Sequence, residues 1–466
     1  MSEPAPSEAR RSAEIFGHPR GLIYLCAAEG WERFSYFGMQ SLLVLYLVHY
    51  LLLPEHVDRV FGFEAARRAI ESVTGPLSSA ALASQIFGIY SGLVYLTPLF
   101  GGLLADRWLN RTFTVTIGAI FMALGHFLMA FEASFLPAIT LLLIGVGCFK
   151  GNIASQVGGL YDRGDLRSAT AYQIFQLAIS TSVIISPLVC GTLGEKVGWH
   201  YGFGAAGVGM LIGLTTYLSG RRWLPSLERR SHGAGPAVGR LTPREWRALL
   251  LLVLLLPPLG GVMVGNEQMF NAFIVWGEAN FELHLAGFAM PVTWLLSLDA
   301  LISSICVALA IVFWRAYSRR WQEPDDLVKI TIGAGFMTLA PTLLSIASLL
   351  QRGGGGRISP AWGGGFEVVN EIGFALVAPL GLSLYSRAAP RAVQSLMIGV
   401  FYTIYFLSNL AVGRLGGLLE RMDAASFWLL HTGVVGVSTL LVAAAAIWGR
   451  HILIPAEADD PLAVRA

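Results

Sequence analysis

Five ionisable residues stand inside long apolar stretches of the sequence. Glu29, Glu32 and Arg33 are spaced i, i+3 and i+4, which places all three on one face of a helix. Lys150 and Glu267 stand in two other apolar stretches. A charge in the middle of a membrane-spanning helix costs about 2.5–3.5 kcal/mol on insertion scales, so these residues are functional candidates.

The chemistry that these residue types predict is reversible proton binding. If the five side chains face one cavity, three carboxylates oppose two cations, and the simplest neutral state protonates one carboxylate. Arg33 stays charged, whereas a buried lysine such as Lys150 can change its charge. The pattern therefore predicts a proton-coupled carrier. A static salt-bridge lock between helices is the alternative.

The elements that must position these residues are apolar segments. Twelve of them are long enough to cross a hydrocarbon layer of about 30 Å. Backbone amides in lipid must be satisfied within the segment, and period-two alternation is lacking, so each is predicted to be a helix. The predicted spans are 21–53, 81–105, 113–131, 136–161, 168–191, 200–220, 248–276, 286–314, 328–350, 364–386, 391–418 and 425–450.

The composition is also typical of a membrane protein. The chain has 466 residues, of which 55% are hydrophobic and 13% are charged, against roughly 25% charged in soluble domains. The lipid bilayer is therefore the expected partner, and a soluble nucleic-acid binder is excluded. The four cysteines form no CxxC pair, so neither a metal site nor a disulfide framework is predicted. No cofactor is expected beyond H⁺ as the coupling ion.

Arginine placement predicts the topology. Most arginines fall in loops that share one side of the membrane if both termini are cytoplasmic. The expected organisation is a tail (1–20), a six-helix bundle (21–220), a polar cytoplasmic linker (221–247), a second six-helix bundle (248–450) and a tail (451–466). Two pseudo-symmetric six-helix halves, with a site between them, define the major-facilitator fold of all-α membrane proteins.

A short motif follows the second predicted span. Gly102, Asp106, Arg107 and Arg111 match the G-x-x-x-D-R-x-x-x-R pattern that this superfamily carries in an inner loop. The resemblance implies a gate in which these charges couple neighbouring helix ends. A loop that only anchors the topology is the alternative.

The first span also carries a family signature. Its segment EGWERFSYFG (29–38) resembles the ExxERFxYYG motif of the proton-dependent oligopeptide transporter family. Further blocks similar to that family cover most of the chain, at 149–153, 159–165, 186–188, 199–207, 266–268, 379–383, 389–390 and 395–397.

The resemblance implies a symporter that imports di- and tripeptides with protons by alternating access. In that family the residues matching Glu29, Glu32, Arg33, Lys150 and Glu267 carry proton coupling. Tyrosines near the first motif and on the second helix line the family's pocket. They correspond here to Tyr36 and Tyr95, and helix packing is the alternative for Tyr95.

Five positions depart from the family pattern. Gln40 stands where an arginine commonly holds the peptide carboxylate, and Phe37 replaces the second tyrosine. Ser180 replaces an asparagine, Phe374 a glutamate and Phe401 a tryptophan. These changes keep open an alternative: a proton-coupled carrier for another small solute, or drug efflux.

Two carboxylates could compensate for the missing glutamate. Asp299 stands where the family usually has Asn-Pro, and Glu371 lies three residues before Phe374. The hypothesis is that Asp299 or Glu371 binds the amino group of the substrate. Asn266, beside Glu267, is a further candidate binding residue.

An enzyme is not expected, because the chain lacks HExxH and GxSxG motifs. A non-transporting sensor is a further alternative, which the intact coupling charges oppose. The expected location is a bacterial inner membrane, and the protein is expected to function as a monomer.

Overall fold

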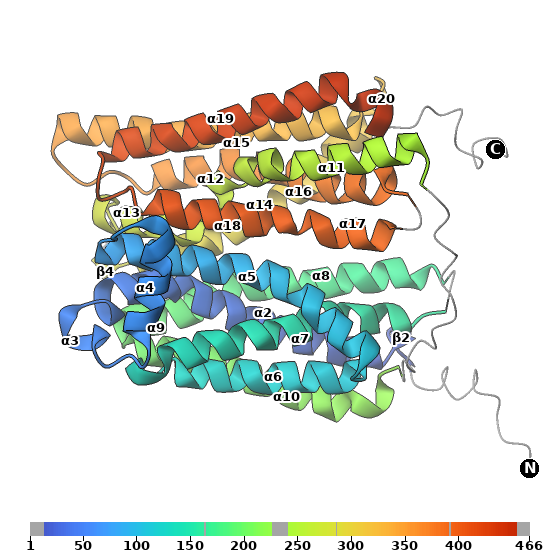
Figure 1. Ribbon diagram of the computed structural model, residues 1–466, viewed down its shortest axis with the longest axis horizontal. Helices are drawn as coiled ribbons and strands as arrows, with labels where there is room; N and C mark the ends of the chain where they lie inside the picture. Colours follow the sequence, from blue (N-terminus) through green and yellow to red (C-terminus); the bar gives the residue numbers. More distant parts are fainter. Residues whose placement is uncertain (1–13, 163–164, 226–240, 286, 391–392, 454–466) are drawn as a thin grey trace, which may run out of the picture. The chain divides into compact units, whose positions relative to one another are not determined.

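The computed structural model describes residues 14–162, 165–225, 241–285, 287–390 and 393–453, and it is built almost entirely of helices (Figure 1). Within these ranges, twelve helical spans are long and apolar enough to cross a membrane. The predicted all-α class and the number of spans are confirmed.

The spans differ from the predicted ones mainly at their ends. The helices that form them are α2 (Gly21–Tyr46), α5 (Ser79–Arg107), α6 (Arg111–Leu128), α7 (Phe135–Gly159), α8 (Arg167–Ser186), α9 (Thr192–Lys196), α10 (Trp199–Gly220), α11 (Pro243–Val262), α12 (Val264–Glu267), α14 (Trp294–Tyr317), α15 (Asp326–Gly354), α16 (Ala361–Ala388), α17 (Gln394–Phe401), α18 (Thr403–Gly416) and α19 (Ala424–Trp448). Single π turns extend α2 (Leu47–Leu51) and join α8 to α9 (Pro187–Gly191).

The chain divides into two compact units. The first comprises residues 1–76 and 96–233. In it α2 packs against α8 and α10, and α6 packs against α7 and α10. The second half of α5 crosses α7 where Gly101 meets the backbone of Gly147, an approach that leaves no space for a side chain.

The second unit comprises residues 77–95 and 234–466. Its core lies where α15 packs against α16 and α19, and where α11 packs against α18 and α19. The first half of α5 belongs to this unit, because Gly88 lies directly on the backbone of Asn409 and Gly413 in α18. The predicted division into 21–220 and 248–450 did not anticipate this split of α5.

The seventh span is broken, although 248–276 was predicted as one helix. After α11 and α12 come a single 3-10 turn (Gln268–Phe270), a non-helical residue at Asn271 and the helix α13 (Ala272–Asn280). Side chains stabilise the break: Gln268 Oε1 accepts from the Ala272 amide, and Asn271 Nδ2 donates to the Val412 carbonyl of α18. Discontinuous helices of this kind position ion and substrate sites in transporters.

Several short elements outside the spans were not predicted. They are the helices α3 (Pro54–Val57), α4 (Phe63–Thr74) and α20 (Arg450–Leu453), and the hairpins β1–β2 (Glu14–Ile15, His18–Pro19) and β3–β4 (His284–Leu285, Phe288–Ala289). The predicted linker 221–247 is shorter than expected, because α11 begins at Pro243 with a capping box between Thr242 and Glu245. Most of that linker, like most of both tails, lies outside the described residues.

Candidate functional site

The predicted charge triad of the first span forms a contact group inside α2. Arg33 Nε donates to Glu29 Oε1 at 2.9 Å and lies 2.7 Å from Glu32 Oε2. All three residues are buried, with relative exposures of 3%, 0% and 4% for Glu29, Glu32 and Arg33. One guanidinium therefore touches two carboxylates, and its single charge leaves the triad with one net negative charge when both are ionised.

Two predicted residues of the first unit stand next to the triad. Lys150 of α7 is half-buried and acts on Glu32 through its charge. The Tyr36 ring lies 5.9 Å from the Arg33 guanidinium carbon and is 2% exposed. The first unit thus brings together four of the predicted residues, Glu29, Glu32, Arg33 and Lys150, with Tyr36 beside them.

The broken seventh span positions Glu267 at the end of α12. Its carboxylate is 7% exposed and accepts a hydrogen bond of 2.8 Å from Asn409 Nδ2 on α18. The next residue, Gln268, donates to the Val412 carbonyl and is hydrogen-bonded to His431. These bonds tie the break to α18 and α19, so that the backbone around Glu267 has a fixed geometry.

A second group of carboxyls, which sequence reasoning only partly identified, lies elsewhere in the same unit. Glu371 Oε1 on α16 accepts from Asn266 Nδ2 at 2.8 Å and from Asn370 Nδ2 at 2.9 Å. Ser303 and Asp299 of α14 also lie near its carboxyl group. The two predicted candidates for amino-group binding, Asp299 and Glu371, therefore lie near each other.

Glu367 completes this group and was missed in the sequence. It lies one turn before Glu371 on α16, it is 0% exposed, and both of its carboxylate oxygens lack a hydrogen-bond partner among the described residues. The i, i+4 spacing of Glu367 and Glu371 within an apolar span was the available signal. We call Asp299, Glu367 and Glu371 the carboxyl cluster.

The other predicted binding residues lie in different surroundings. Tyr95 stacks on Tyr405 with 4.7 Å between ring centroids. Phe401 is 2% exposed and packs against Gly381 and Tyr385 in the core of the second unit. Both are held by aromatic packing.

In the first unit, Gln40 is buried on α2 and Ser180 is half-buried on α8. The predicted gate motif spans the turn between α5 and α6. Arg107 is exposed at the end of α5 and Arg111 is half-buried at the start of α6, while the side chain of Asp106 lies outside what the structure describes.

Outside the spans, a polar cluster links the first hairpin to the turn before α8. Arg167 forms ion pairs with Glu14 and Asp165 at 3.0 and 2.9 Å. Hydrogen bonds from Arg167 lower the pKa of Asp165. The Tyr161 hydroxyl is hydrogen-bonded to His18 Nδ1 at 2.8 Å, and burial raises the pKa of this tyrosine to about 12.

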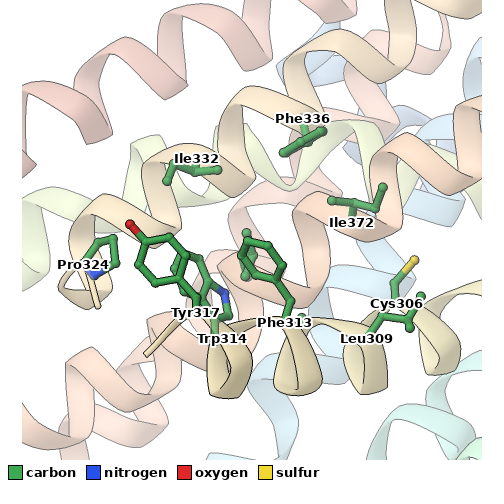
Figure 2. A pocket seen from close by; sticks show the side chains of 11 residues that line it. Cys306, Leu309, Phe313, Trp314, Tyr317, Pro324, Ile332, Phe336 and Ile372 are labelled. Carbon is green, nitrogen blue, oxygen red and sulfur yellow. The ribbon is translucent and has the colours of Figure 1, made fainter. Parts of the chain in front are cut away.

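Figure 2 shows an apolar groove on the second unit, with a volume of about 540 Å³. Its wall comes from α14, α15, α16 and the turn before α15, and it is formed by Cys306, Leu309, Ala310, Phe313, Trp314, Tyr317, Pro324, Ile332, Phe336, Ile372 and Leu376. None of these side chains carries a charge that could hold an ammonium or carboxylate group. The groove therefore offers an almost entirely apolar surface.

The four cysteines are free and buried. Within the described ranges, no group of three or more His, Cys, Asp or Glu side chains has an arrangement suited to a metal ion.

Twelve spanning helices with buried ionisable side chains inside them define a membrane transport protein, because such side chains mark pathways for ions and polar solutes. The sequence model described as the POT family matches residues 112–243 and 240–429. The chain belongs to the POT family, and it is a transporter, not an enzyme.

Similar proteins extend over almost the whole chain. The "Uncharacterized transporter YclF" of Bacillus subtilis (strain 168) is 28% identical and covers 92% of this chain and 93% of its own length. The "Di-/tripeptide transporter" of Lactococcus lactis subsp. cremoris is also 28% identical, over 91% of this chain and 94% of its own length.

The structure is similar to a crystal structure of a peptide transporter POT in complex with sulfate. The TM-score is 0.81 at 23% identity, covering 95% of this chain and 98% of that chain. This similarity confirms the predicted major-facilitator fold.

Proposed function

We propose that this transporter is a symporter that imports di- and tripeptides together with protons. The observation that carries the proposal is the buried triad of α2, in which one arginine faces two glutamates. Arginine keeps its charge, so only the glutamates can take up and release a proton. The similarity to a di-/tripeptide transporter of Lactococcus lactis supports the choice of cargo.

Proton binding biases the carrier between its conformations. Protonation of Glu29 or Glu32 would leave Arg33 paired with one carboxylate and remove the excess negative charge of the triad. Lys150 and Glu267 take part as the remaining coupling residues of the two units. Proton binding populates the conformation in which the neutral triad is more stable. The peptide shifts the same equilibrium further, because it binds the two conformations with different affinities.

The topology, oligomeric state and minor roles are part of the same proposal. Both termini are cytoplasmic in the inner membrane of a bacterium, the monomer is the functional form, and Arg107 and Arg111 belong to a cytoplasmic gate. Asp299 or Glu371 receives the amino group of the substrate, and Tyr36, Gln40 and Asn266 contribute polar contacts.

Uptake by proteoliposomes tests the cargo. Liposomes with an acidic exterior should accumulate a labelled dipeptide, and unlabelled di- and tripeptides should compete whereas free amino acids and tetrapeptides should not. Proton-driven uptake of another solute without peptide competition would overturn the cargo assignment. In Asp299→Asn and Glu371→Gln, a free dipeptide should lose its advantage over an N-acetylated one, and unchanged discrimination in both variants would remove their assigned role.

A further inference from the structure

The apolar groove of the second unit lies open along a membrane-spanning helix. Only 22% of the most apolar stretch of α14, which forms much of its wall, is buried inside the protein. Leu309, Phe313 and Ile332 at the groove are 60%, 57% and 42% exposed. Figure 2 shows Cys306 at one end of the groove and Pro324 at the other. In a bilayer, hydrocarbon chains fill such a groove, because its lining would otherwise lose packing contacts.

Aromatic rings mark one end of the groove. Trp314, Tyr317 and Trp321 form a row there, with 5.4 Å and 5.2 Å between successive ring centroids. The first two line the groove, whereas Trp321 is 59% exposed in the turn that follows α14. Tryptophan and tyrosine gather at the level of the lipid headgroups. This end of the groove therefore lies at headgroup depth, and Cys306 lies about 16 Å further along α14, at the 1.5 Å rise per residue of a helix.

Positive charge is in excess at the headgroup end of the groove. Every acidic side chain between residues 318 and 329 is paired with a cation of the second unit, and these pairs are Glu323–Lys329, Asp325–Arg450 and Asp326–Arg387. Arg315, Arg319 and Arg320 are exposed in the last turn of α14 and directly after it. None of these three arginines forms an ion pair within the part of the chain that the structure describes. The groove therefore ends beside three arginines that neighbouring acids do not neutralise.

We propose that the groove binds an acyl chain of one anionic phospholipid, whose headgroup phosphate is held by Arg315, Arg319 and Arg320. Guanidinium groups form charge-assisted hydrogen bonds with phosphate oxygens. Lys329 has a different role, because it is buried in its ion pair and its ammonium nitrogen lies 4.7 Å from the centroid of the Trp314 ring. That contact holds the ring in the wall of the groove. A zwitterionic phospholipid carries its own cation and is held less tightly.

Photocrosslinking of the purified full-length chain tests this site without measuring transport. The protein is reconstituted in phosphatidylcholine nanodiscs with a small fraction of phosphatidylglycerol that carries a diazirine in its acyl chain, and labelled peptides are mapped by mass spectrometry. We expect adducts concentrated within 306–317 and 332–336. A phosphatidylcholine probe with the same diazirine should give about tenfold fewer adducts there, because each basic residue near the surface adds a several-fold preference for an anionic headgroup.

Two variants separate the headgroup contact from the chain contact. Arg315→Gln/Arg319→Gln/Arg320→Gln should lower the yield of the phosphatidylglycerol adducts about tenfold or more, for the same electrostatic reason. Ala310→Trp keeps the arginines but fills the groove, and it should also remove the adducts. Thermal unfolding in detergent establishes that both variants fold.

The matched control is Arg221→Gln/Arg222→Gln/Arg247→Gln, which removes three exposed arginines from the ends of α10 and α11 and should leave the labelling unchanged. An equal loss in this control would reduce the effect to general attraction between the protein and anionic lipid, and would overturn the site. Equal labelling by the two probes, adducts spread evenly over the apolar faces of all spans, or unchanged labelling in either test variant would overturn it as well.

Discussion

The two units bury acidic groups at similar depth but compensate them in different ways. In the first unit, Arg33 lies within 2.9 Å of both Glu29 and Glu32. In the second unit, Glu371 is held by neutral amide donors, and no described ion pair reaches the carboxyl cluster. A fixed cation compensates one of the two carboxylates of the triad, whereas the hydrogen-bond partners of Glu371 are neutral amides.

The comparison predicts that Arg33 is the most sensitive position. Arg33→Gln leaves two buried carboxylates without their cation, and breaking such a buried pair costs about 3–5 kcal/mol. We expect a large fall in thermal stability in detergent and a complete loss of proton-driven uptake. Arg59→Gln is the control, because the Arg59 side chain is 64% exposed where it pairs with Glu132. Equal effects of the two substitutions would refute the importance of the triad.

The spare carboxylate of the triad should govern coupling more than binding. Glu32→Gln removes a titrating group while Arg33 keeps Glu29, so the fold should persist. We expect accumulation under a pH gradient to fall roughly tenfold or more, in line with loss of one charge-assisted interaction. Peptide exchange at equal pH should be retained. Gradient-driven accumulation at the unmodified level would show that Glu32 does not couple.

The neutral donors of the second unit should matter less than Arg33. Asn266→Leu removes one of the amides that donate to Glu371 Oε1, and an unmade hydrogen bond to a buried group costs about 1–3 kcal/mol. Unfolding measured by intrinsic fluorescence should show a loss in that range. A loss as large as that of Arg33→Gln would mean that the two units do not differ in this respect.

Exposed charges should have the smallest effect. Asp423 caps α19, and hydrogen bonds from Ser426 together with Arg352 lower its pKa. A carboxyl whose pKa is lower in the folded than in the unfolded state stabilises the fold above the unfolded pKa, and this contribution is lost as the pH falls through the folded value. The melting temperature of Asp423→Asn should therefore approach that of the unmodified protein below about pH 3, near the usual range of aspartate. A constant difference at all pH values would contradict this.

Sequence reasoning anticipated the elements that depend on length and hydropathy. The twelve spans and the i, i+3, i+4 grouping of Glu29, Glu32 and Arg33 follow from local periodicity, which helices preserve. The break after Glu267 was missed, because it depends on side chains of Gln268 and Asn271 that reach residues far along the chain. Local sequence carries only weak signs of it, such as the glycine at position 265.

The carboxyl cluster also could not be predicted as a group, because residues far apart in the sequence form it. Asp299 and Glu371 were singled out separately because each stands in an apolar span, but their proximity depends on the packing of α14 against α16. Glu367 and Asn370 were overlooked, although they flank Glu371 on α16. The sequence identified Phe401 and Tyr95 as pocket residues, and the structure holds both in aromatic packing.

Direct detection of proton movement tests the central claim. Proteoliposomes carry a pH-sensitive dye in the lumen, and a dipeptide is added outside with the membrane potential clamped. We expect the lumen to acidify as the peptide enters, and both acidification and gradient-driven accumulation to be strongly reduced in Glu32→Gln. Peptide entry by the unmodified protein without acidification would contradict the account.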